Sequence, residues 1–424
     1  MNQARGKSHE KRVKGGGRRY YDYNLLAIVI LLTCFGLIML YSASAYRAQI
    51  TEKAAKDMEY FGKQAKICAV CLAGVLIASQ IDYHFYAKFA GIAYLAANFL
   101  IIITKFIGRS ANGATRWIYV GGVSFQAAEF GKVAIILLLP VVIVKMGRKI
   151  RGFKAPAMVL LLGAVTSICT LYFTSNLSTA IIIAGITIVL LGVTHPRAKR
   201  FAILGGGAIV AAVYAVRRFA ESEWFAHFVG SLESGGSLQN RLNRLLVWVD
   251  PETYSSAGGY QVMQGLYAIG SGGFFGKGLG NSIQKLSAVP EAQNDMIFAI
   301  ICEELGVFGA AMLTLMFIFM LYRLMFIAQN APDLLGSLIV TGIFAHIALQ
   351  VVLNIAVVLN MIPTTGITLP FVSYGGTSIV FLMVEMALAL SVSKQIEFQT
   401  AENVSGQPAQ NPQRGLRPER RKAQ

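Results

Sequence analysis

Ten long apolar runs, separated by short polar stretches, dominate this sequence. Each run approaches the length of about 20 residues that an α-helix needs to cross a bilayer. Inside a bilayer a helix satisfies its own backbone hydrogen-bonding groups, whereas an irregular chain does not. The sequence therefore predicts an all-α, polytopic integral membrane protein with about ten transmembrane helices. The predicted spans are 22–43, 65–81, 88–106, 128–146, 156–173, 178–194, 201–219, 295–325, 335–359 and 376–394.

The composition excludes an ordinary soluble domain and argues against a nucleic-acid-binding protein. Of the 424 residues, 55% are hydrophobic and only 14% are charged, which is far too apolar for a soluble fold. The formal net charge is +17, but the basic residues are concentrated in the two tails and a few short loops. Membrane orientation explains that distribution better, because Lys and Arg accumulate in cytoplasmic loops. We therefore expect membrane lipid around the protein and no nucleic-acid partner.

The distribution of Lys and Arg also predicts which helix ends face the cytoplasm. Basic residues cluster in the tail 1–21, the segment 145–154, the turn 197–200 and the tail 395–424. Positively charged loops stay on the cytoplasmic side, so both termini are expected there, which requires an even number of spans. The membrane domain then covers residues 22–394, and its large polar loop 220–294 is extracytoplasmic.

Four unusual loops fall on the predicted outer face, namely 108–128, 174–177, 220–294 and 360–375. The last contains Pro363 and Pro370, which break helices. Non-helical backbone survives at membrane depth only against protein or a wet cavity. We interpret 360–375 as a re-entrant segment that lines an outer cavity, with an ordinary loop as the alternative. The stretch GSGGFFGKGLG at 270–280 fails the P-loop pattern, because no Ser or Thr follows its Lys, and it is interpreted as a flexible, close-packed loop.

The stretch VPEAQNDMIFAIICEELG at 289–306 places acidic residues where a membrane protein tolerates few. Asp295 lies in the first turn of a predicted helix, at its water-facing mouth, and Glu303 and Glu304 lie about 12 Å deeper. Ionisable residues at this depth are costly and mark functional sites. The alternative is structural. Asp295 or Asn294 then caps the helix, and the Glu pair bonds a neighbouring helix.

Other polar side chains in or near the spans allow two interpretations. Glu129 and Lys132 are spaced i, i+3 on one helix face, where they either neutralise each other or contact substrate. Arg116, next to a tryptophan, either binds an anionic head group or anchors the chain at the interface. His346 and Glu385 are isolated within their apolar runs, and we interpret each as a hydrogen-bonded packing residue.

Together these motifs resemble the SEDS family of bacterial cell-envelope proteins (shape, elongation, division and sporulation; FtsW, RodA and SpoVE). The resemblance covers nearly the whole chain apart from the tails. Its most specific segments are PEAQNDMIFAIICEELG at 290–306 and PTTGITLPFVSYGG at 363–376. GATRWI at 113–118 and the glycine-rich stretch 270–280 add to it.

The resemblance implies a peptidoglycan glycosyltransferase that polymerises lipid II at the outer leaflet and works with a class B penicillin-binding protein, a transpeptidase. In that family the Asp aligned with Asp295 is the essential acidic residue, so Asp295 is the expected catalytic base. The candidate substrate-binding residues are Arg116, Lys132, Arg241, Arg244, Lys277, Lys285, Ser373 and Tyr374. The candidate supporting acids are Glu129, Glu291, Glu303 and Glu304. A divalent cation, Mg²⁺ or Mn²⁺, is the alternative to the basic residues for holding pyrophosphate.

The choice of branch and activity stays open at this point. The segment 363–366, PTTG, is closer to the cell-division branch than the PVTG common in the elongation and sporulation branches. It predicts a bacterial plasma-membrane protein at the division septum, with other divisome proteins as partners. The rival activity is a lipid II flippase, which would depend on buried charges such as Glu303, Glu304 and Glu385. A non-catalytic scaffold for the partner synthase is the third alternative.

Overall fold

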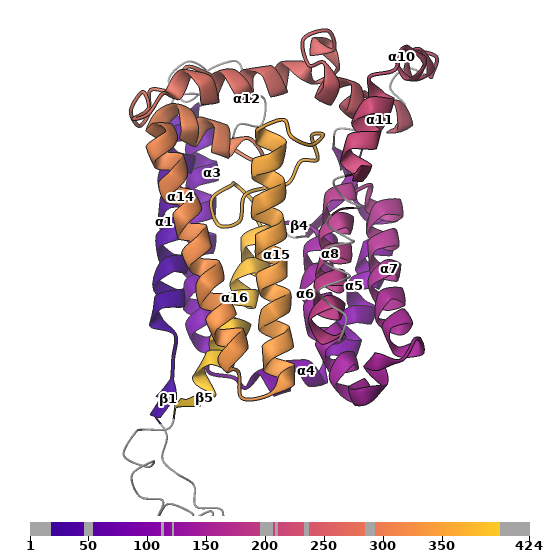
Figure 1. The fold of residues 1–424 in the computed structure, drawn as a ribbon. Coiled ribbons are helices and arrows are strands. Elements are labelled where there is room, and N and C mark those ends of the chain that lie inside the picture. The colour runs from indigo at the N-terminus through magenta and orange to yellow at the C-terminus, as the bar shows by residue number, and fades with distance from the viewer. Residues whose placement is uncertain are drawn as a thin grey trace, which may run out of the picture.

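Nine long helices in the described part of the chain stand side by side and form the body of the molecule (Figure 1). The computed structural model describes residues 18–45, 54–111, 114–120, 123–195, 207, 211–232, 237–284 and 293–398. The long helices are α1 Tyr23–Ala45, α3 Ala54–Ala78, α5 Ala90–Ile107, α6 Ala127–Met146, α7 Lys154–Thr174, α8 Leu177–Thr194, α14 Ile297–Asn330, α15 Leu334–Val358 and α16 Ser378–Lys394. The short helix α4 Tyr83–Lys88 and the 3₁₀ helix η1 Gly147–Arg151 connect some of them.

The predicted all-α polytopic fold is confirmed. Eight of the described helices are long and apolar enough to cross a membrane. The predicted span at 376–394 is α16, which is 17 residues long and mostly buried. The predicted span at 201–219 lies largely outside the described residues, although 211–220 is helical.

Helices α6 and α15 form the centre of the bundle. Helices α5, α7 and α8 pack against α6, whereas α14 and α16 pack against α15, and α15 also contacts α6 and α8. In Figure 1, α15 stands between these two groups. Its central position explains why α15 buries the polar side chains of His346, Gln350 and Asn354, and why α6 buries Glu129 and Lys132. These groups face other helices, where a charge in contact with lipid would be costly.

The polar segment 220–294, predicted as one large loop, contains helices that lie across one end of the bundle (Figure 1). They are α10 Glu223–Gly230, α11 Ser237–Val249, the 3₁₀ helix η2 Ser255–Ala257 and α12 Gly259–Gly272. Helix α11 buries Leu246, Val247 and Trp248. The indole Nε1 of Trp248 donates to the backbone carbonyl of Asn360 at 3.1 Å. This segment is therefore an ordered cap, in which Leu246 packs with Ala220, Phe225 and Val229 in a small apolar cluster of their own and α12 packs against α14.

The loop 108–128 forms a small antiparallel sheet that the sequence analysis did not predict. Its strands are β2 Arg109–Ala111, β3 Ala114–Val120 and β4 Val123–Phe125, in the order β2-β3-β4. The central strand, ATRWIYV, is rich in the β-branched and aromatic residues that favour strands. The sheet holds residue 116 in a fixed register, with Trp117 opposite Arg109 and Ile118 opposite Phe125.

The segment between α15 and α16 is irregular, and its second part, 367–373, is largely buried, as expected for a re-entrant segment. Residues 359–377 contain no helix, and Leu369, Phe371 and Val372 are buried. Helix α1 approaches this segment through Gly36, where a Cβ atom would lie 2.4 Å from the carbonyl oxygen of Phe371. Only glycine permits that approach. The irregular backbone is therefore surrounded by protein, which is the condition for its survival at membrane depth.

Helix α14 is broken at Gly306, whose φ of 69° and ψ of −167° are non-helical. The glycine-rich stretch 273–278 inserts at this break and supplies backbone hydrogen bonds in place of those that the helix loses. The bonds run from Lys277 N to Glu303 O at 2.9 Å, Gly278 N to Glu304 O at 2.9 Å, Val307 N to Gly273 O at 3.0 Å and Phe308 N to Phe274 O at 3.0 Å. The predicted close packing of 270–280 is confirmed.

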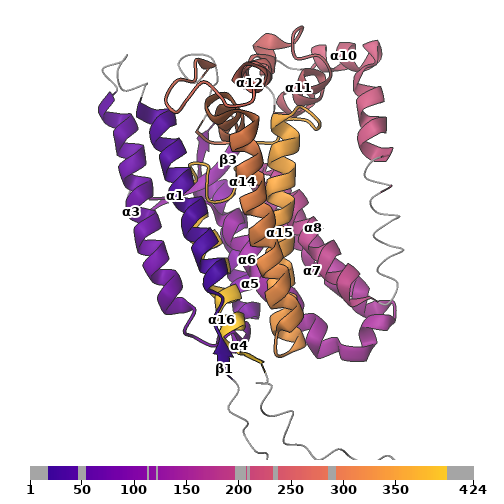
Figure 2. The ribbon, with the colours of Figure 1, turned by 60° about the vertical axis from the view of Figure 1, so that its left-hand side comes forward.

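The two termini of the described chain meet at the end of the bundle opposite α10, α11 and α12 (Figures 1 and 2). There β1, Arg18–Tyr20, pairs antiparallel with β5, Ile396–Phe398. Most of the two predicted basic tails, 1–21 and 395–424, lies outside the described residues. The segment 220–284 and the chain ends thus lie at opposite ends of the helices, an arrangement compatible with the predicted topology.

Membrane orientation can be tested with two exposed positions at opposite ends. We expect Glu252→Cys, between α11 and η2, to react with an impermeant thiol reagent on intact cells that lack an outer membrane. Lys149→Cys, in η1, should react only after the cells are opened, because a loop with basic surroundings is expected on the cytoplasmic side. Both variants are made with the five native cysteines replaced. The reverse labelling pattern would overturn the orientation.

Candidate active site

A cavity of about 440 Å³ lies beneath the cap helices and is lined by all four of the loops singled out in the sequence. Its volume is within the usual range for small-molecule sites. Polar residues on its wall include Arg116, Ser124, Gln126, Asn176, Arg244, Gln261, Asn294, Asp295, Thr368 and Tyr374. These residues come from the sheet, the turn before α8, the cap helices, the start of α14 and the re-entrant segment. The fold thus gathers in one place residues that are far apart in the sequence.

Asp295 lies on the cavity wall, two residues before α14 begins. Gln261 Nε2 donates to its Oδ1 at 3.4 Å, and Asn354 Nδ2 donates to its backbone carbonyl at 3.0 Å. The predicted position in the first turn was wrong, because α14 starts at Ile297 and its N-cap residue is Met296, which makes no side-chain capping bond. The carboxylate is therefore held by the cavity wall next to the helix.

Three arginines approach one another beside this carboxylate. Arg116 Nη2 donates to the carbonyl of Ser175 at 3.1 Å, and Arg244 Nη1 donates to that of Thr364 at 3.3 Å. Burial lowers the pKa of the Arg116 guanidinium, and the positive charges of Arg244 and Arg241 lower it further. The Nε–H of Arg116 is buried and has no acceptor among the described residues. Like charges gathered around an unsatisfied donor favour the binding of an anion.

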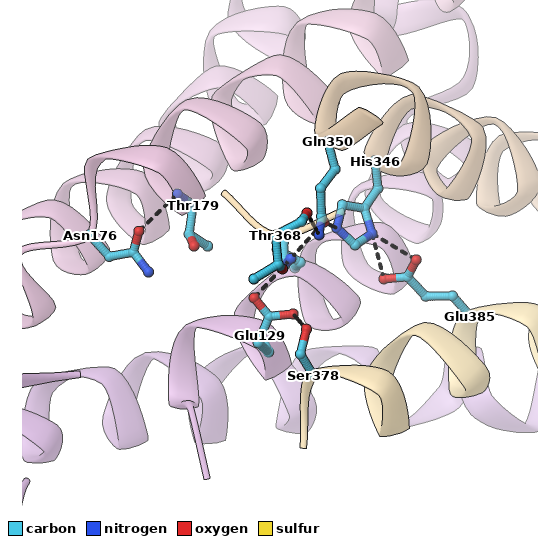
Figure 3. A network of polar contacts seen from close by, with 9 residues as sticks. Glu129, Asn176, Thr179, His346, Gln350, Thr368, Ser378 and Glu385 are labelled. Carbon is cyan, nitrogen blue, oxygen red and sulfur yellow. Dashed lines mark hydrogen bonds and ion pairs between the residues drawn. The ribbon is translucent and has the colours of Figure 1, made fainter. Parts of the chain in front are cut away.

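The ion pair between Glu129 and Lys132, one of the two alternatives for these residues, is present in the structure and lines the cavity. Lys132 Nζ lies 2.9 Å from Glu129 Oε1, and both side chains are almost fully buried. Lys132 also donates to Gln350 Oε1 at 3.2 Å, and Ser378 Oγ donates to Glu129 Oε2 at 2.9 Å. Figure 3 shows Glu129, Gln350 and Ser378 converging from three segments. The ammonium of Lys132 is thus a fixed positive charge on the inner wall.

His346 and Glu385 are isolated in the sequence but pair with each other in the fold, and the interpretation of each as a hydrogen-bonded packing residue is confirmed. His346 Nδ1 lies 2.7 Å from Glu385 Oε2, and its Nε2 lies 2.8 Å from Gln350 Oε1 (Figure 3). Gln350 Nε2 donates to the backbone carbonyl of Thr368 at 3.0 Å. Helices α15 and α16 bring the two residues together across 39 positions of sequence, a separation that no local pattern encodes.

Several predicted residues have partners away from the cavity. Lys277 Nζ lies 2.8 Å from Oε1 of the fully buried Glu303, and neither residue lines the cavity. Glu304 is also fully buried and accepts a hydrogen bond from a serine of α1. Ser373 Oγ accepts from the backbone N–H of Leu369 at 2.7 Å and stabilises the re-entrant turn. None of these four residues lines the cavity, and the contacts described for them are structural.

The remaining candidates have different positions. Tyr374 lines the cavity as predicted. Arg241 is exposed on α11 and contributes through its charge, without lining the cavity itself. Lys285 and Glu291 lie outside the described residues.

Helix α15 carries a stripe of polar residues that was present in the sequence but was not predicted as a feature of the site. His346, Gln350 and Asn354 recur at i, i+4 and i+8 within one apolar run, which places them on one face of a helix. All three are buried, and Gln350 and Asn354 both contact the cavity region. Gln261 had no comparable signal, because it lies in a cap helix of mixed composition.

The residues on the wall fit a divalent cation only if the substrate supplies part of its coordination. Within the described ranges no three His, Cys, Asp or Glu side chains form a metal-binding group. Asp295 contributes one carboxylate, and the side-chain amides of Gln261 and Asn294 line the same cavity. Mg²⁺ commonly binds through one or two carboxylates together with substrate phosphates.

Known proteins resemble this chain over nearly its whole length. The sequence pattern of the FtsW, RodA and SpoVE cell cycle proteins matches residues 22–397. Stage V sporulation protein E of Bacillus subtilis is 35% identical over 377 residues, which cover 88% of this chain and 97% of that protein. A probable peptidoglycan glycosyltransferase FtsW of Trichlorobacter lovleyi is 34% identical over 376 residues, which cover 88% and 93%. The corresponding FtsW of Bacillus subtilis is 33% identical over 391 residues, which cover 89% and 92%.

Solved structures share the fold. A chain of a peptidoglycan synthase complex, described as coordinating polymerisation and crosslinking, superposes with a TM-score of 0.70 at 24% identity and covers 89% of this chain and 98% of its own. The rod shape determining protein RodA of Thermus thermophilus superposes with a TM-score of 0.58 at 22% identity, with coverage of 89% and 98%. The match to the family pattern spans the whole membrane domain, and this chain belongs to the SEDS family of FtsW, RodA and SpoVE proteins.

Proposed function

We propose that this chain is a peptidoglycan glycosyltransferase that polymerises lipid II at the outer leaflet of the bacterial plasma membrane. The observation that carries the proposal is the pairing, in one cavity, of the Asp295 carboxylate with a cluster of cations. Asp295 lies on the same wall as Arg116, Arg244 and Lys132. Probable peptidoglycan glycosyltransferases are among the relatives that this chain matches over most of its length.

The cations suit the leaving group of this reaction. Lipid II carries its sugars on a pyrophosphate, which leaves readily once its charge is neutralised. Arg116 offers an unsatisfied Nε–H, and Arg244 and Lys132 add charge around the same space. Charge-assisted hydrogen bonds to phosphate are about twice as strong as neutral ones. A divalent cation, where bound, would supply further neutralisation next to Asp295.

The carboxylate suits the proton transfer. In the proposed step, the acceptor hydroxyl oxygen attacks the anomeric carbon of the donor and forms the new glycosidic bond. The bond between that carbon and the pyrophosphate oxygen breaks, and the lipid pyrophosphate leaves with the electron pair. Asp295 takes the hydroxyl proton. Attack on one face and departure from the other invert the anomeric centre.

The cellular role that we propose is septal wall synthesis together with a class B penicillin-binding transpeptidase. The partner is supported by the likeness to a chain of a peptidoglycan synthase complex. The division role rests on PTTG at 363–366. Identities of 35% to a sporulation protein and of 33–34% to FtsW proteins are too similar to separate the branches. Depletion in the source organism should give filaments without septa, whereas rounded cells or failed spores would assign another branch.

Polymerisation by the purified protein is the direct test of the activity. We expect the chain, reconstituted with its partner transpeptidase and labelled lipid II, to produce long glycan strands on a gel. The partner alone serves as the control. If lipid II crosses the membrane of proteoliposomes without being polymerised, the flippase alternative replaces this proposal.

A further inference from the structure

A buried chain of polar side chains extends behind the cavity, from Lys132 through Gln350 and His346 to Glu385. Figure 3 shows the part of it from Gln350 to Glu385. Gln350 is 2% exposed, His346 is 1% exposed and Glu385 is fully buried. Polar groups at such positions are costly unless they are hydrogen-bonded. The proposed reaction uses only the cavity end of this chain. The hydrogen-bond geometry of Gln350, His346 and Glu385 determines which of their atoms carry hydrogens.

Two partners, Lys132 and Thr368, identify which atom of the Gln350 side-chain amide is the oxygen and which is the nitrogen. Lys132 Nζ can only donate, so the atom at 3.2 Å must be the amide oxygen. The carbonyl of Thr368 can only accept, so the atom at 3.0 Å must be the amide nitrogen. A flipped amide would place donor against donor and acceptor against acceptor. The donor Lys132 and the acceptor carbonyl of Thr368 therefore assign the amide oxygen and nitrogen of Gln350.

The orientation of the Gln350 amide in turn identifies which ring nitrogen of His346 carries a hydrogen. The Gln350 oxygen can only accept, so His346 Nε2, at 2.8 Å, must carry a hydrogen. The other ring nitrogen, Nδ1, lies 2.7 Å from Glu385 Oε2. Two lone pairs cannot face each other at that distance, so a proton lies between them. The pair is either imidazolium with carboxylate or neutral imidazole with carboxylic acid, and it has no net charge in either form.

We propose that Glu385 and His346 are positioning residues that act through Gln350 to hold the Lys132 ammonium at the cavity, ready for the pyrophosphate of the donor. This rests on the proposed function. Glu385 keeps the hydrogen on Nε2 of the ring, and that hydrogen keeps the amide oxygen of Gln350 turned towards Lys132. Without Glu385 only the Gln350 oxygen still selects the tautomer with a hydrogen on Nε2. The imidazole then adopts the other tautomer more often, and the Nε2 lone pair of that tautomer repels the amide oxygen. Lys132 then keeps only Glu129 as a partner.

Two substitutions of Glu385 distinguish a positioning role of this residue from a packing role. Glu385→Leu removes the group that selects the tautomer. Glu385→Gln keeps it, because the amide N–H can donate to Nδ1 and leave the hydrogen on Nε2. The probe is undecaprenyl pyrophosphate in nanodiscs, and the readout is its affinity for the purified full-length protein. We expect Glu385→Leu to weaken the affinity about tenfold, as loss of an orienting hydrogen bond to a charged group implies, and Glu385→Gln to leave it unchanged.

The same measurements in a Lys132→Met background test whether the effect passes through Lys132. Once the ammonium is absent, Glu385→Leu should cause no further loss, since coupled residues are non-additive. Asp22→Leu is the control for the loss of a buried ion pair, because Asp22 is fully buried and pairs with Arg323 at 2.7 Å at the opposite end. It should lower the melting temperature and leave the affinity unchanged.

An equal loss from Glu385→Leu with and without Lys132 overturns the positioning role. A loss from Glu385→Gln as large as that from Glu385→Leu overturns the tautomer argument. If Glu385→Leu does not accumulate, Gln350→Met gives the same test, because it removes the shared oxygen. Failure of the proposed function would be seen separately, as wild-type protein that makes no glycan.

Discussion

Asp295→Asn is expected to lower the rate of glycan polymerisation by about 10²–10⁴-fold, the usual contribution of a general base. The amide has nearly the shape of the carboxylate, and its oxygen can still accept the hydrogen bond from Gln261. It cannot take the proton of the acceptor hydroxyl. Helix α14 should be unaffected, because its N-cap residue is Met296. The measurement is glycan-strand length on a gel, made with protein shown to be monodisperse and bound to its partner.

Asp333→Asn is the matched control, because it makes the same substitution at a true helix cap. Asp333 Oδ1 accepts the backbone N–H of Gly336 at 2.7 Å at the start of α15. Asn caps helices about as well as Asp, so this variant should polymerise at the normal rate. A near-normal rate from Asp295→Asn would remove it as the base. Glu129, the other carboxylate on the cavity wall, would then be the candidate.

The membrane fold was predictable because the bilayer imposes one dominant rule. A helix that spans it must be apolar for about 20 residues, and that pattern is local. The strands at 109–125 were not predicted, since short paired strands in a polar loop carry no such period. The cap helices at 223–272 were missed as well. Their apolar residues are present in the sequence, but the polar composition of the segment led to its interpretation as a loop.

The site was predictable only in part, because its contacts depend on which helices are neighbours. Asp295 could be identified from its motif, and the Glu129–Lys132 pair from its i, i+3 spacing. The pairing of His346 with Glu385 joins different helices, and no spacing predicts it. The sequence nevertheless contained the polar stripe on α15, which indicates a buried face.

Arg244 and Lys277 are similar in the sequence but have different contacts in the fold. Replacing each with Met should therefore have opposite effects on kinetics and on stability. Both are basic residues of the polar segment 220–294, and the sequence analysis gave them the same role. Arg244 lines the cavity and is exposed, with a bond to the carbonyl of Thr364 at 3.3 Å. Lys277 instead contacts the fully buried Glu303 at 2.8 Å. The break at Gly306 draws the glycine-rich stretch against α14 and thereby directs Lys277 away from the cavity.

We expect Arg244→Met to lower kcat/KM for lipid II by about 10–100-fold, the value of a charge-assisted contact to phosphate, with an unchanged melting temperature. Lys277→Met should leave the KM unchanged and destabilise the fold by about 2 kcal/mol, because it leaves the Glu303 carboxylate buried without its cation. The partial exposure of Lys277, 28%, keeps this cost below that of a fully buried pair. Steady-state kinetics and thermal melting of both purified variants measure the two effects. A raised KM in Lys277→Met with normal melting would return Lys277 to the substrate site, and normal kinetics in Arg244→Met would assign the pyrophosphate to Arg116 and Lys132.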